Sequence, residues 1–292
     1  MDANLQRRVQ RYGWDLAASA YEALWRAQLA PAHDALVASA RLGPGTRVLD
    51  VACGTGTIAF RCARAVGPGG RVTGVDLSGR MIEEAARRAR ALRVRNVAFV
   101  REDAEALALP DASVDAVVCA FGLMYVPDPG RAMAEMVRVL RPGGRVVAAV
   151  WGRRARCGWS PLFRVVDAEV ATDVCPLFFR LGERGALARH FASAGLAAID
   201  ELRMDATLAY RNADEACNAA FLAGPVALAW SRFDDHVRAR VRERYTAAIA
   251  RWRRGRGYRM PAEFVVAAAE RPTMQASVGN AAVAAATTVA PA

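Results

Sequence analysis

The sequence predicts an α/β fold with a doubly wound sheet of five parallel strands, closed at one edge by a terminal antiparallel pair. Between residues 46 and 151, short β-branched apolar runs alternate with Ala-rich amphipathic stretches, which is the pattern of repeated βα units. Turns rich in Gly and Pro precede several of these runs. Two later apolar runs lie too far apart in the sequence to continue that rhythm, so we expect them to pair with each other.

The parallel strands are predicted at residues 46–51, 71–76, 96–101, 113–120 and 144–151. Helices are predicted between them at residues 56–66, 78–92 and 129–140. The runs at 114–120 and 146–150 are continuously apolar, as expected for strands buried on both faces. These features together predict a Rossmann-like core over residues 43–152.

The flanking segments predict three further parts. Residues 1–42 are expected to form a helical cap of two helices, rich in aromatic residues. Residues 153–272 should hold a helix at 183–194, strands at 197–210 and 262–269, and a helical insertion at 211–259 on the acceptor side, broken at Gly224-Pro225. Residues 273–292 show no periodicity and few large apolar side chains, which predicts a flexible tail.

The composition is that of a globular protein, with 54% hydrophobic and 24% charged residues. No apolar run is long enough to predict a membrane span, and the polar N-terminus predicts no secretory leader, so a cytoplasmic location is expected. The net charge of +11 comes from arginine alone. Since the excess is spread along the chain, it indicates a compositional bias more than a nucleic-acid surface.

The densest arginine cluster is residues 238–259, where Glu243 is the sole acid. We interpret it as a solvated helix face, while an acidic carrier protein stays an open alternative. Nucleic acid is disfavoured because aromatic residues are not interleaved for base stacking. The cysteines and the three histidines fit no metal-site spacing, so no metal is expected and the thiols should be reduced.

The strongest chemical signal is the run from Val48 to Gly56, in which a strand leads through a Gly-rich loop into a helix. Its Gly54-Thr55-Gly56-Thr57-Ile58-Ala59 also fits a dinucleotide fingerprint. Asp50 separates the two interpretations, because a carboxylate there would repel a pyrophosphate and favour a ligand that carries positive charge.

Two further acids follow neighbouring strands. Asp76 ends the second strand, where a carboxylate can accept both hydroxyls of a ribose; the alternative role is a helix N-cap, for which Ser78 is better suited. Asp103 follows the third strand and could accept an adenine amino hydrogen, although acids also gather on solvated loops.

Taken together, these motifs resemble the class I S-adenosylmethionine-dependent methyltransferases, in the branch similar to ubiquinone/menaquinone biosynthesis methyltransferases. The resemblance covers residues 14 to about 155 and rests on Trp14-x-x-x-Ala18-x-x-Tyr21, Val48–Gly56, Gly74–Ser78 with Met81, Glu102–Ala104, Phe121–Met124 and Glu135–Gly144. It implies S-adenosylmethionine as cofactor. The cofactor-binding residues it implies are Tyr21, Asp50, Ala52, Gly54, Gly56, Asp76, Leu77, Met81, Asp103, Ala104, Ala120 and Phe121.

The acceptor is expected to be a small molecule, such as a secondary metabolite or quinone-like compound. The fourth strand lacks the Asn/Asp-Pro-Pro-Tyr/Phe element of enzymes that methylate amino groups of nucleic acids. Candidate acceptor-binding aromatics are Trp25, Tyr125, Trp151, Phe178, Phe221 and Trp230. No catalytic base is identified, His190 being a weak candidate. One alternative is a protein that binds S-adenosylmethionine without methylating, or that uses it for another transfer or a cyclisation. A remote alternative is an NAD-dependent oxidoreductase.

Overall fold

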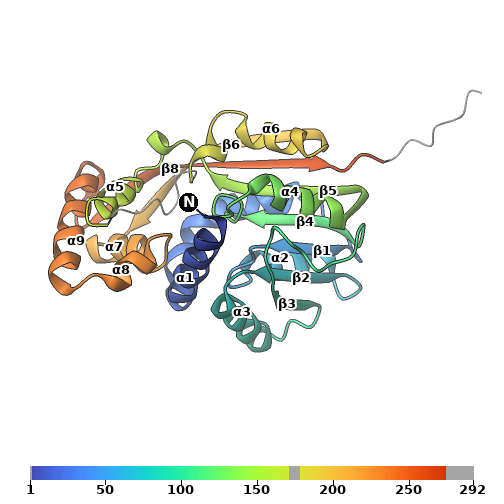
Figure 1. Ribbon diagram of the computed structural model, residues 1–292, viewed down its shortest axis with the longest axis horizontal. Coiled ribbons are helices and arrows are strands. Elements are labelled where there is room, and N and C mark those ends of the chain that lie inside the picture. Colours follow the sequence, from blue (N-terminus) through green and yellow to red (C-terminus); the bar gives the residue numbers. More distant parts are fainter. Residues whose placement is uncertain (1, 171–177, 274–292) are drawn as a thin grey trace, which may run out of the picture.

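The protein, seen in a computed structural model that describes residues 2–170 and 178–273, is organised around one mixed sheet (Figure 1). Its strand order is β3-β2-β1-β4-β5-β8-β6, and the short β7 pairs with β8. The strands are β1 (Arg47–Val51), β2 (Arg71–Asp76), β3 (Val97–Arg101), β4 (Val114–Ala120), β5 (Leu140–Trp151), β6 (Ala197–Tyr210), β7 (Arg253–Arg254) and β8 (Gly257–Glu270). The α/β fold class is therefore confirmed.

The direction of the strands follows the prediction. Strands β1 to β5 are parallel, and β8 runs antiparallel to both β5 and β6. The chain order reverses between β1 and β4, which lie side by side at the centre of the sheet. In open α/β sheets, ligands bind outside the carboxyl ends of the strands at such a reversal. The topology therefore predicts a binding site at the carboxyl ends of the strands, next to β1 and β4.

The helices are α1 (Ala3–Ser39), α2 (Thr57–Val66), α3 (Gly79–Leu92), α4 (Pro129–Val139), α5 (Pro161–Asp167), α6 (Ala186–Ser193), α7 (Ala213–Phe221), α8 (Ala227–Arg232) and α9 (Asp235–Ile249). Short 3-10 turns occur at η1 (Arg154–Arg156), η2 (Arg180–Gly182) and η3 (Ala250–Trp252). Helices α2, α3 and α4 follow β1, β2 and β4, as expected for βα units.

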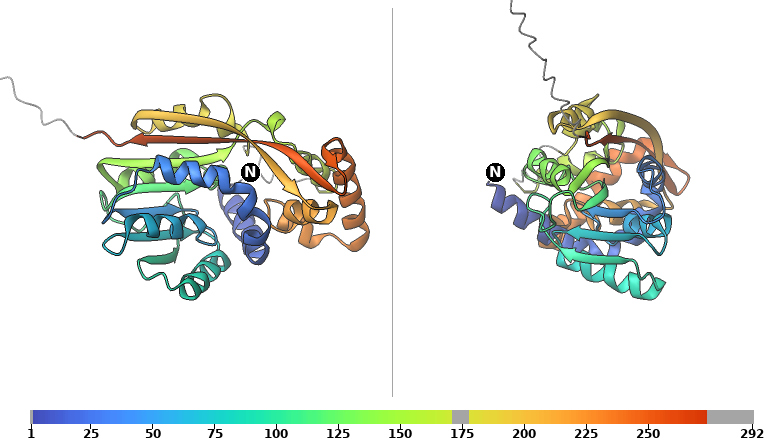
Figure 2. Two further views of the ribbon diagram at one scale, coloured as in Figure 1. Left: turned by 180° about the vertical axis from the view of Figure 1, so that it is seen from behind. Right: turned by 90° about the vertical axis from the view of Figure 1, so that its right-hand side faces the viewer.

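The N-terminal cap differs from the prediction in its number of helices. Residues 3–39 form the single helix α1, where two helices were expected, and Pro31 lies inside it. A proline removes one helical hydrogen bond and crowds the preceding turn, so it bends a helix without having to end it. Figure 2 shows α1 changing direction along its length. The bend lets one helix contact both the sheet and the helices near the C-terminus.

The C-terminal part also differs at its boundaries. Strand β8 begins at Gly257, five positions before the predicted Ala262, so the helical insertion ends before Arg259. Strand β5 begins at Leu140, before the predicted Gly144. Both differences arise from strand pairing: β8 bonds to β6 from Tyr258 onward, and Leu140 of β5 pairs with Val114 of β4. Helices α5, α7, α8 and α9 gather at one end of the molecule, beyond α1 (Figure 1).

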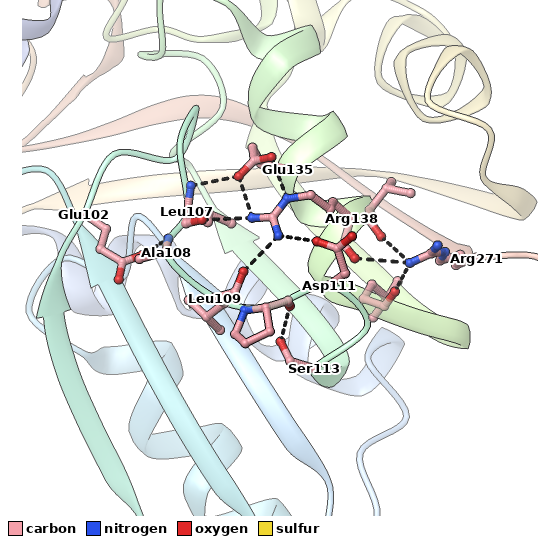
Figure 3. Close-up of polar contacts among 12 residues, drawn as sticks. Glu102, Leu107, Ala108, Leu109, Asp111, Ser113, Glu135, Arg138 and Arg271 are labelled. Carbon is pink, nitrogen blue, oxygen red and sulfur yellow. Dashed lines mark hydrogen bonds and ion pairs between the residues drawn. The ribbon is translucent and has the colours of Figure 1, made fainter.

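Part of the sequence motif at residues 135–144 serves to hold the connection that follows β3 (Figure 3). Arg138 forms a two-point ion pair with Glu135, with both nitrogen–oxygen distances 2.8 Å. The same guanidinium donates to the carbonyls of Leu107 at 2.8 Å and Leu109 at 2.9 Å, and to Asp111 at 2.6 Å. One arginine on α4 therefore fixes the long connection that carries Asp103.

One continuous hydrophobic core joins the parallel sheet to the insertion. It includes Val117 of β4, Trp151 of β5 and Tyr245 of α9, each at most 4% exposed. Within the described residues, none of the helices combines the length and apolar character that a bilayer crossing needs. The predicted tail from residue 274 onward lies outside the described residues, as does Cys175.

Candidate functional site

A cavity lies at the carboxyl ends of the strands, at the reversal of strand order. It has a volume of about 770 Å³, counting the part open to solvent. We call it the edge cavity. Its walls come from the segments that follow β1, β2, β3 and β4, and helix α1 contributes the remaining side. The lining residues are Arg7, Gln10, Trp14, Tyr21, Ala52, Gly54, Val75, Asp76, Leu77, Met81, Glu102, Asp103, Ala104, Ala120, Phe121, Gly122, Tyr125, Val126 and Pro127.

The edge cavity brings together most of the cofactor-binding residues predicted from the sequence, from five separate segments. Those that line it are Tyr21, Ala52, Gly54, Asp76, Leu77, Met81, Asp103, Ala104, Ala120 and Phe121. Two predicted residues, Asp50 and Gly56, do not line it. They belong to the strand end and the helix start that support the loop.

The Gly-rich loop after β1 is shaped by close contacts. Gly56 has φ 84° and is the N-cap of α2. A Cβ atom there would lie 2.7 Å from the ring of Phe99, so a side chain is excluded on both conformational and steric grounds. A Cβ on Gly122, which follows β4, would lie 2.4 Å from the Cβ of Ala52. The loop after β4 therefore packs closely against Ala52 of the Gly-rich loop on one wall of the cavity.

Asp76 binds backbone from two sides. One carboxylate oxygen accepts the amide of Gly54 at 2.9 Å, and the other accepts the amide of Ser78 at 2.9 Å. The N-cap of α3 is Ser78, whose hydroxyl accepts from the Met81 amide at 3.1 Å, so the cap role considered for Asp76 is filled by its neighbour. Burial raises the pKa of Asp76 to about 6, against the opposing effect of these backbone donors.

Asp50 lies behind the loop. It is 1% exposed, and neither carboxylate oxygen has a partner with full hydrogen-bond geometry. Burial is the main cause that raises its pKa well above the usual range; the backbone donor of Ala59 opposes this rise, and the charge of Asp76 adds to it. A buried carboxylate favours its protonated form. Asp50 therefore lies outside the wall of the edge cavity and does not contact the space for a ligand.

Asp103 forms an ion pair with Arg7. The Nε atom of Arg7, on α1, lies 2.9 Å from a carboxylate oxygen of Asp103, and the same guanidinium contacts Glu105. Glu105 is 2% exposed and accepts the amide of Asp128 at 3.1 Å. The N-terminal turns of α1 are therefore fixed across the third strand end by two acids.

A second ion pair ties the Gly-rich loop to two helices. Arg88 of α3 binds both oxygens of Glu22 on α1, at 2.8 and 2.9 Å, and donates to the carbonyl of Thr55 at 2.7 Å. Glu22 also accepts the hydroxyls of Thr55 at 3.0 Å and Thr57 at 2.7 Å. We call these four residues the loop clamp. Sequence reasoning missed it, because its members come from three separate segments.

A smaller cavity of about 350 Å³, again counting the part open to solvent, adjoins the edge cavity. The two share Trp14, Tyr21, Phe121 and Tyr125 as common walls. We call it the aromatic cavity. Its other lining residues are Trp25, Leu29, Trp151, Trp159, Ala223, Gly224 and Pro225. Phe121 has φ 59°, a conformation that non-glycine residues rarely adopt, and this turns its ring into the shared wall.

The predicted acceptor-binding residues divide into three groups. Trp25, Tyr125 and Trp151 line the aromatic cavity, and Phe178 lies behind Tyr125, with ring centroids 5.3 Å apart. Phe221 and Trp230 line neither cavity; they stack on each other at 4.5 Å inside the helical insertion. Their side chains point into the core of that insertion. The insertion instead contributes its turn at 223–225 to the cavity wall.

No described histidine lines either cavity. His190 bonds through Nε2 to the carbonyl of Pro129 at 2.8 Å. His33 packs against Phe121 with ring centroids 6.0 Å apart, and burial lowers its pKa to about 4. Burial also raises the pKa of Tyr21, which keeps its hydroxyl protonated near neutral pH. The aromatic cavity thus presents rings and neutral hydroxyls, and the carboxylates of Asp76, Glu102 and Asp103 line only the edge cavity.

The sequence analysis did not identify Arg7 and Gln10 as part of the site. Arg7, Gln10, Trp14 and Tyr21 all line the edge cavity. Their spacings of three, four and seven positions put them on one face of a helix. A search for this periodicity in the first helix would have found the side of the cavity that lies opposite the strands.

Comparison with known proteins agrees with this arrangement. Residues 48–144 match a family described as a methyltransferase domain. The demethylmenaquinone methyltransferase of Staphylococcus aureus is 40% identical over 137 residues, which cover 47% of this chain and 54% of that relative. The chain spans about half the length of the curated relatives it matches.

Solved structures share the fold over a longer stretch. The YcgJ protein from Bacillus subtilis aligns with a TM-score of 0.58 at 19% identity, covering 83% of this chain and 99% of that one. A phosphoethanolamine N-methyltransferase 2 from Haemonchus contortus aligns with a TM-score of 0.57 at 17% identity, covering 89% of this chain and 58% of that one. At these identities the likeness concerns the fold alone.

Proposed function

Because residues 48–144 belong to the class I S-adenosylmethionine-dependent methyltransferases, in the menaquinone-like branch, we propose that this chain transfers a methyl group from S-adenosylmethionine to a small-molecule acceptor. The observation that carries the proposal is the union of two unlike cavities. One is walled by backbone loops and acids, the other by aromatic rings, and they meet at Phe121 and Tyr125.

The edge cavity suits the cofactor in charge and shape. Asp76, Glu102 and Asp103 line it, and Arg7, the basic residue in its described wall, is already paired with Asp103. An excess of acids favours a ligand that bears a sulfonium and an ammonium group. Gly122 lies so close to the Cβ of Ala52 that no side chain fits at position 122. The volume of about 770 Å³ lies within the range of small-molecule sites.

We assign the roles as follows. Asp76 would accept the ribose hydroxyls, since each of its oxygens has a lone pair beyond the one used by Gly54 or Ser78. Ala52 and Gly54 would hold the methionine portion, with Gly56 supporting the loop. Leu77 and Met81 would flank the adenine, whose edge would face Asp103 and Ala104. Asp50 would act from behind the loop as a positioning residue.

When bound, S-adenosylmethionine supplies an electrophilic methyl group: the acceptor atom forms the new bond to carbon, and the sulfonium keeps the electron pair of the broken bond. The residues of this chain align the two partners and exclude water. Phe121, Tyr21 and Tyr125 form the wall between the cavities. Alignment of this kind can contribute about 7 to 11 kcal/mol of rate acceleration. No described acid or histidine lines the aromatic cavity, so a proton released by an acceptor bound there would leave toward the edge cavity, which Asp76, Glu102 and Asp103 line.

The parts of the chain would then divide the work. Residues 43–152 would bind the cofactor, and residues 1–42 and 153–272 would shape the acceptor side. Within the arginine-rich segment, Arg240 and Arg244 pair with Glu169, and Arg242 contacts Asp214. These internal partners favour a structural role over binding of a carrier protein or nucleic acid. The five described free cysteines accord with the proposed cytoplasmic location.

Titration calorimetry tests the cofactor assignment. S-adenosylhomocysteine should bind in a one-to-one complex, and NAD should not bind. Mass spectrometry of small-molecule extracts incubated with the protein and S-adenosylmethionine should then detect methylated products. Binding of NAD without any response to S-adenosylhomocysteine would overturn the proposal, and binding of S-adenosylhomocysteine without any methylated product would favour a non-methylating role.

A further inference from the structure

A groove lined by arginines lies at the amino edge of the sheet, opposite the edge cavity. Its walls come from the connection between α2 and β2 and from the connection between α3 and β3. It has a volume of about 1150 Å³, counting the part open to solvent. We call it the arginine groove, after Arg64, Arg71, Arg93 and Arg95. Because the edge cavity lies at the carboxyl ends of the same strands, the two sites are separate.

The four guanidinium groups of the groove have no carboxylate partner in the described part of the chain. All four side chains are exposed, and none forms an ion pair or a side-chain hydrogen bond with a described residue. Arginines nearby on the same helices are paired: Arg61 of α2 lies 2.7 Å from Asp34, and Arg87 of α3 lies 2.6 Å from Glu84. Four like charges around one hollow repel one another, so a bound anion is favoured there.

The backbone carbonyls next to the groove are already bonded. The carboxyl end of a helix carries partial negative charge, which opposes the binding of an anion. The side-chain amide of Asn96 donates to the carbonyls of Ala63 and Gly67, both at 2.9 Å. The carbonyl of Val66 accepts the amide of Gly45 at 2.9 Å. These donors offset the negative end of α2, so the charge of the arginines prevails in the groove.

Arg93 has a backbone conformation that favours glycine. It is the C-cap of α3, with φ 54° and ψ 33°, in the left-handed region. Helices commonly end on glycine in this conformation, because a Cβ atom is crowded there. A charged side chain therefore stands at a position where backbone stability alone selects glycine. Its structural role could only be the attraction between its charge and the carboxyl end of α3.

We propose that the arginine groove binds a compact polyphosphate through the guanidinium groups of Arg64, Arg71, Arg93 and Arg95. A guanidinium pairs with two phosphate oxygens through parallel hydrogen bonds. A chain of linked phosphates brings several negative charges into the space that the four arginines surround. Nucleic acid is disfavoured, because no aromatic ring among the described lining residues offers a surface for base stacking. This site does not depend on the proposed methyl transfer.

Titration calorimetry of the full chain with tripolyphosphate, without divalent cations, tests the proposal. We expect saturable binding that is at least about tenfold tighter than that of orthophosphate, because a linked chain contacts several arginines at once. Raising the NaCl concentration from about 50 to about 200 mM should weaken binding at least about fivefold. A short oligothymidylate should bind more weakly than tripolyphosphate, since its charges are farther apart and its bases find no ring to stack on.

Variants then separate the groove from the net charge of the chain. Arg71→Gln and Arg95→Gln should each weaken tripolyphosphate binding about three- to fivefold. Arg93→Gly should weaken it by a similar factor and yet keep or raise the melting temperature, because glycine relieves the left-handed backbone. The matched control is Arg256→Gln, since Arg256 is exposed, has no partner among the described residues and lies outside the groove. This control should leave the affinity unchanged.

Several outcomes would overturn the inference. If Arg256→Gln weakens binding as much as the groove variants do, binding follows net charge and not the groove. Orthophosphate binding as tight as that of tripolyphosphate, or no saturable binding, would refute the ligand class. Tighter binding of oligothymidylate, with the same response to the variants, would make the groove a nucleic-acid surface instead. Unchanged affinity in all three groove variants, with a lower melting temperature in Arg93→Gly, would leave the arginines a purely structural role.

The affinity for S-adenosylhomocysteine provides an independent measurement on the same variants. It should change less than about twofold in each, because the groove and the edge cavity lie at opposite edges of the sheet. If S-adenosylhomocysteine does not bind the parent protein, the proposed function fails while the polyphosphate result stands. The two failures are thereby distinguished.

Discussion

The two cavities are built in opposite ways. The edge cavity rests on backbone: strand ends, a Gly-rich loop and hydrogen bonds from main-chain amides to Asp76. The aromatic cavity rests on side chains from α1, β5, the segment before α5 and the turn at 223–225. Most of the first is encoded in short contiguous motifs, whereas the second exists only where distant segments meet.

This difference has a consequence for sequence change. A cavity made of backbone tolerates few residue types, because a single added methyl group can meet main-chain atoms. A cavity made of side chains can exchange one ring for another at modest cost. A small substitution in the edge cavity should therefore reduce ligand affinity strongly. A similar substitution in the aromatic cavity should reduce it only moderately. The following predictions are ordered by their expected effect on the affinity for S-adenosylhomocysteine.

The sharpest test of the backbone-built cavity is Gly122→Ala. The new Cβ would lie 2.4 Å from the Cβ of Ala52 and 2.9 Å from the sulfur of Cys119, so the two loops must move apart. We expect the affinity for S-adenosylhomocysteine to fall about 100-fold and the free energy of unfolding by about 1 to 3 kcal/mol. Calorimetry and thermal melting measure the two effects.

The control for this substitution is Gly43→Ala. No atom lies within 4 Å of a Cβ placed there, so both quantities should stay close to those of the parent protein. A Gly122→Ala variant that binds like the parent would show that the loops separate freely. The contrast between the two cavities would then be lost.

A second prediction concerns pH. Since the pKa of Asp76 is raised to about 6 by burial, and its carboxylate form is the one expected to accept the ribose hydroxyls, protons compete with the ligand. Affinity for S-adenosylhomocysteine should be constant above about pH 7 and decline by up to about tenfold per pH unit below the pKa. Asp76→Asn should remove the pH dependence and weaken binding about 30-fold at pH 8.

Folding of the unliganded protein should show the opposite sign. The folded pKa of about 6 exceeds the usual value of 3.8, so the folded state binds the proton more readily. The contribution of Asp76 to the free energy of unfolding should therefore decrease as the pH rises between these values. Affinity that is independent of pH between 5 and 8 would contradict the assigned role.

The loop clamp provides a third test, because α1 belongs to both cavities. Arg88→Met would leave Glu22 without its two-point partner and free the carbonyl of Thr55. We expect the free energy of unfolding to fall by about 1 to 3 kcal/mol and the affinity for S-adenosylhomocysteine to fall about three- to tenfold. The neighbouring Arg87→Met is the control: its pair with Glu84 is exposed and should matter little.

The smallest effect on the cofactor is expected from Phe221→Leu. Phe221 is fully buried, stacks on Trp230 and packs against Tyr245 at 5.3 Å. The variant should lose about 1 kcal/mol of stability and keep its affinity for S-adenosylhomocysteine within about twofold. A larger loss of affinity, in a variant that still folds, would show that the insertion reaches the cofactor side.

The sequence predicted the parallel strands well because each signal was local. Asp76, for example, ends an apolar run and is followed at once by the helix-capping Ser78, so its place at the edge of the sheet followed from neighbours in the chain. Gly56 was found for the same reason. The bent α1 was missed because Pro31 ends a helix in most local contexts, and here packing against the sheet and α8 keeps the helix continuous.

What the sequence determined by itself was the order of strands and helices around the Gly-rich loop, and the acids at the strand ends, since hydrophobic period and turn chemistry act over a few residues. Only the tertiary structure decided which side chains meet. It paired Arg7 with Asp103, joined Glu22 to Arg88 and set Trp25 beside Trp159, and it removed Phe221 and Trp230 from the aromatic cavity. Such contacts depend on the packing of α1 and the insertion against the sheet, and no local pattern encodes the distance between segments far apart in the chain.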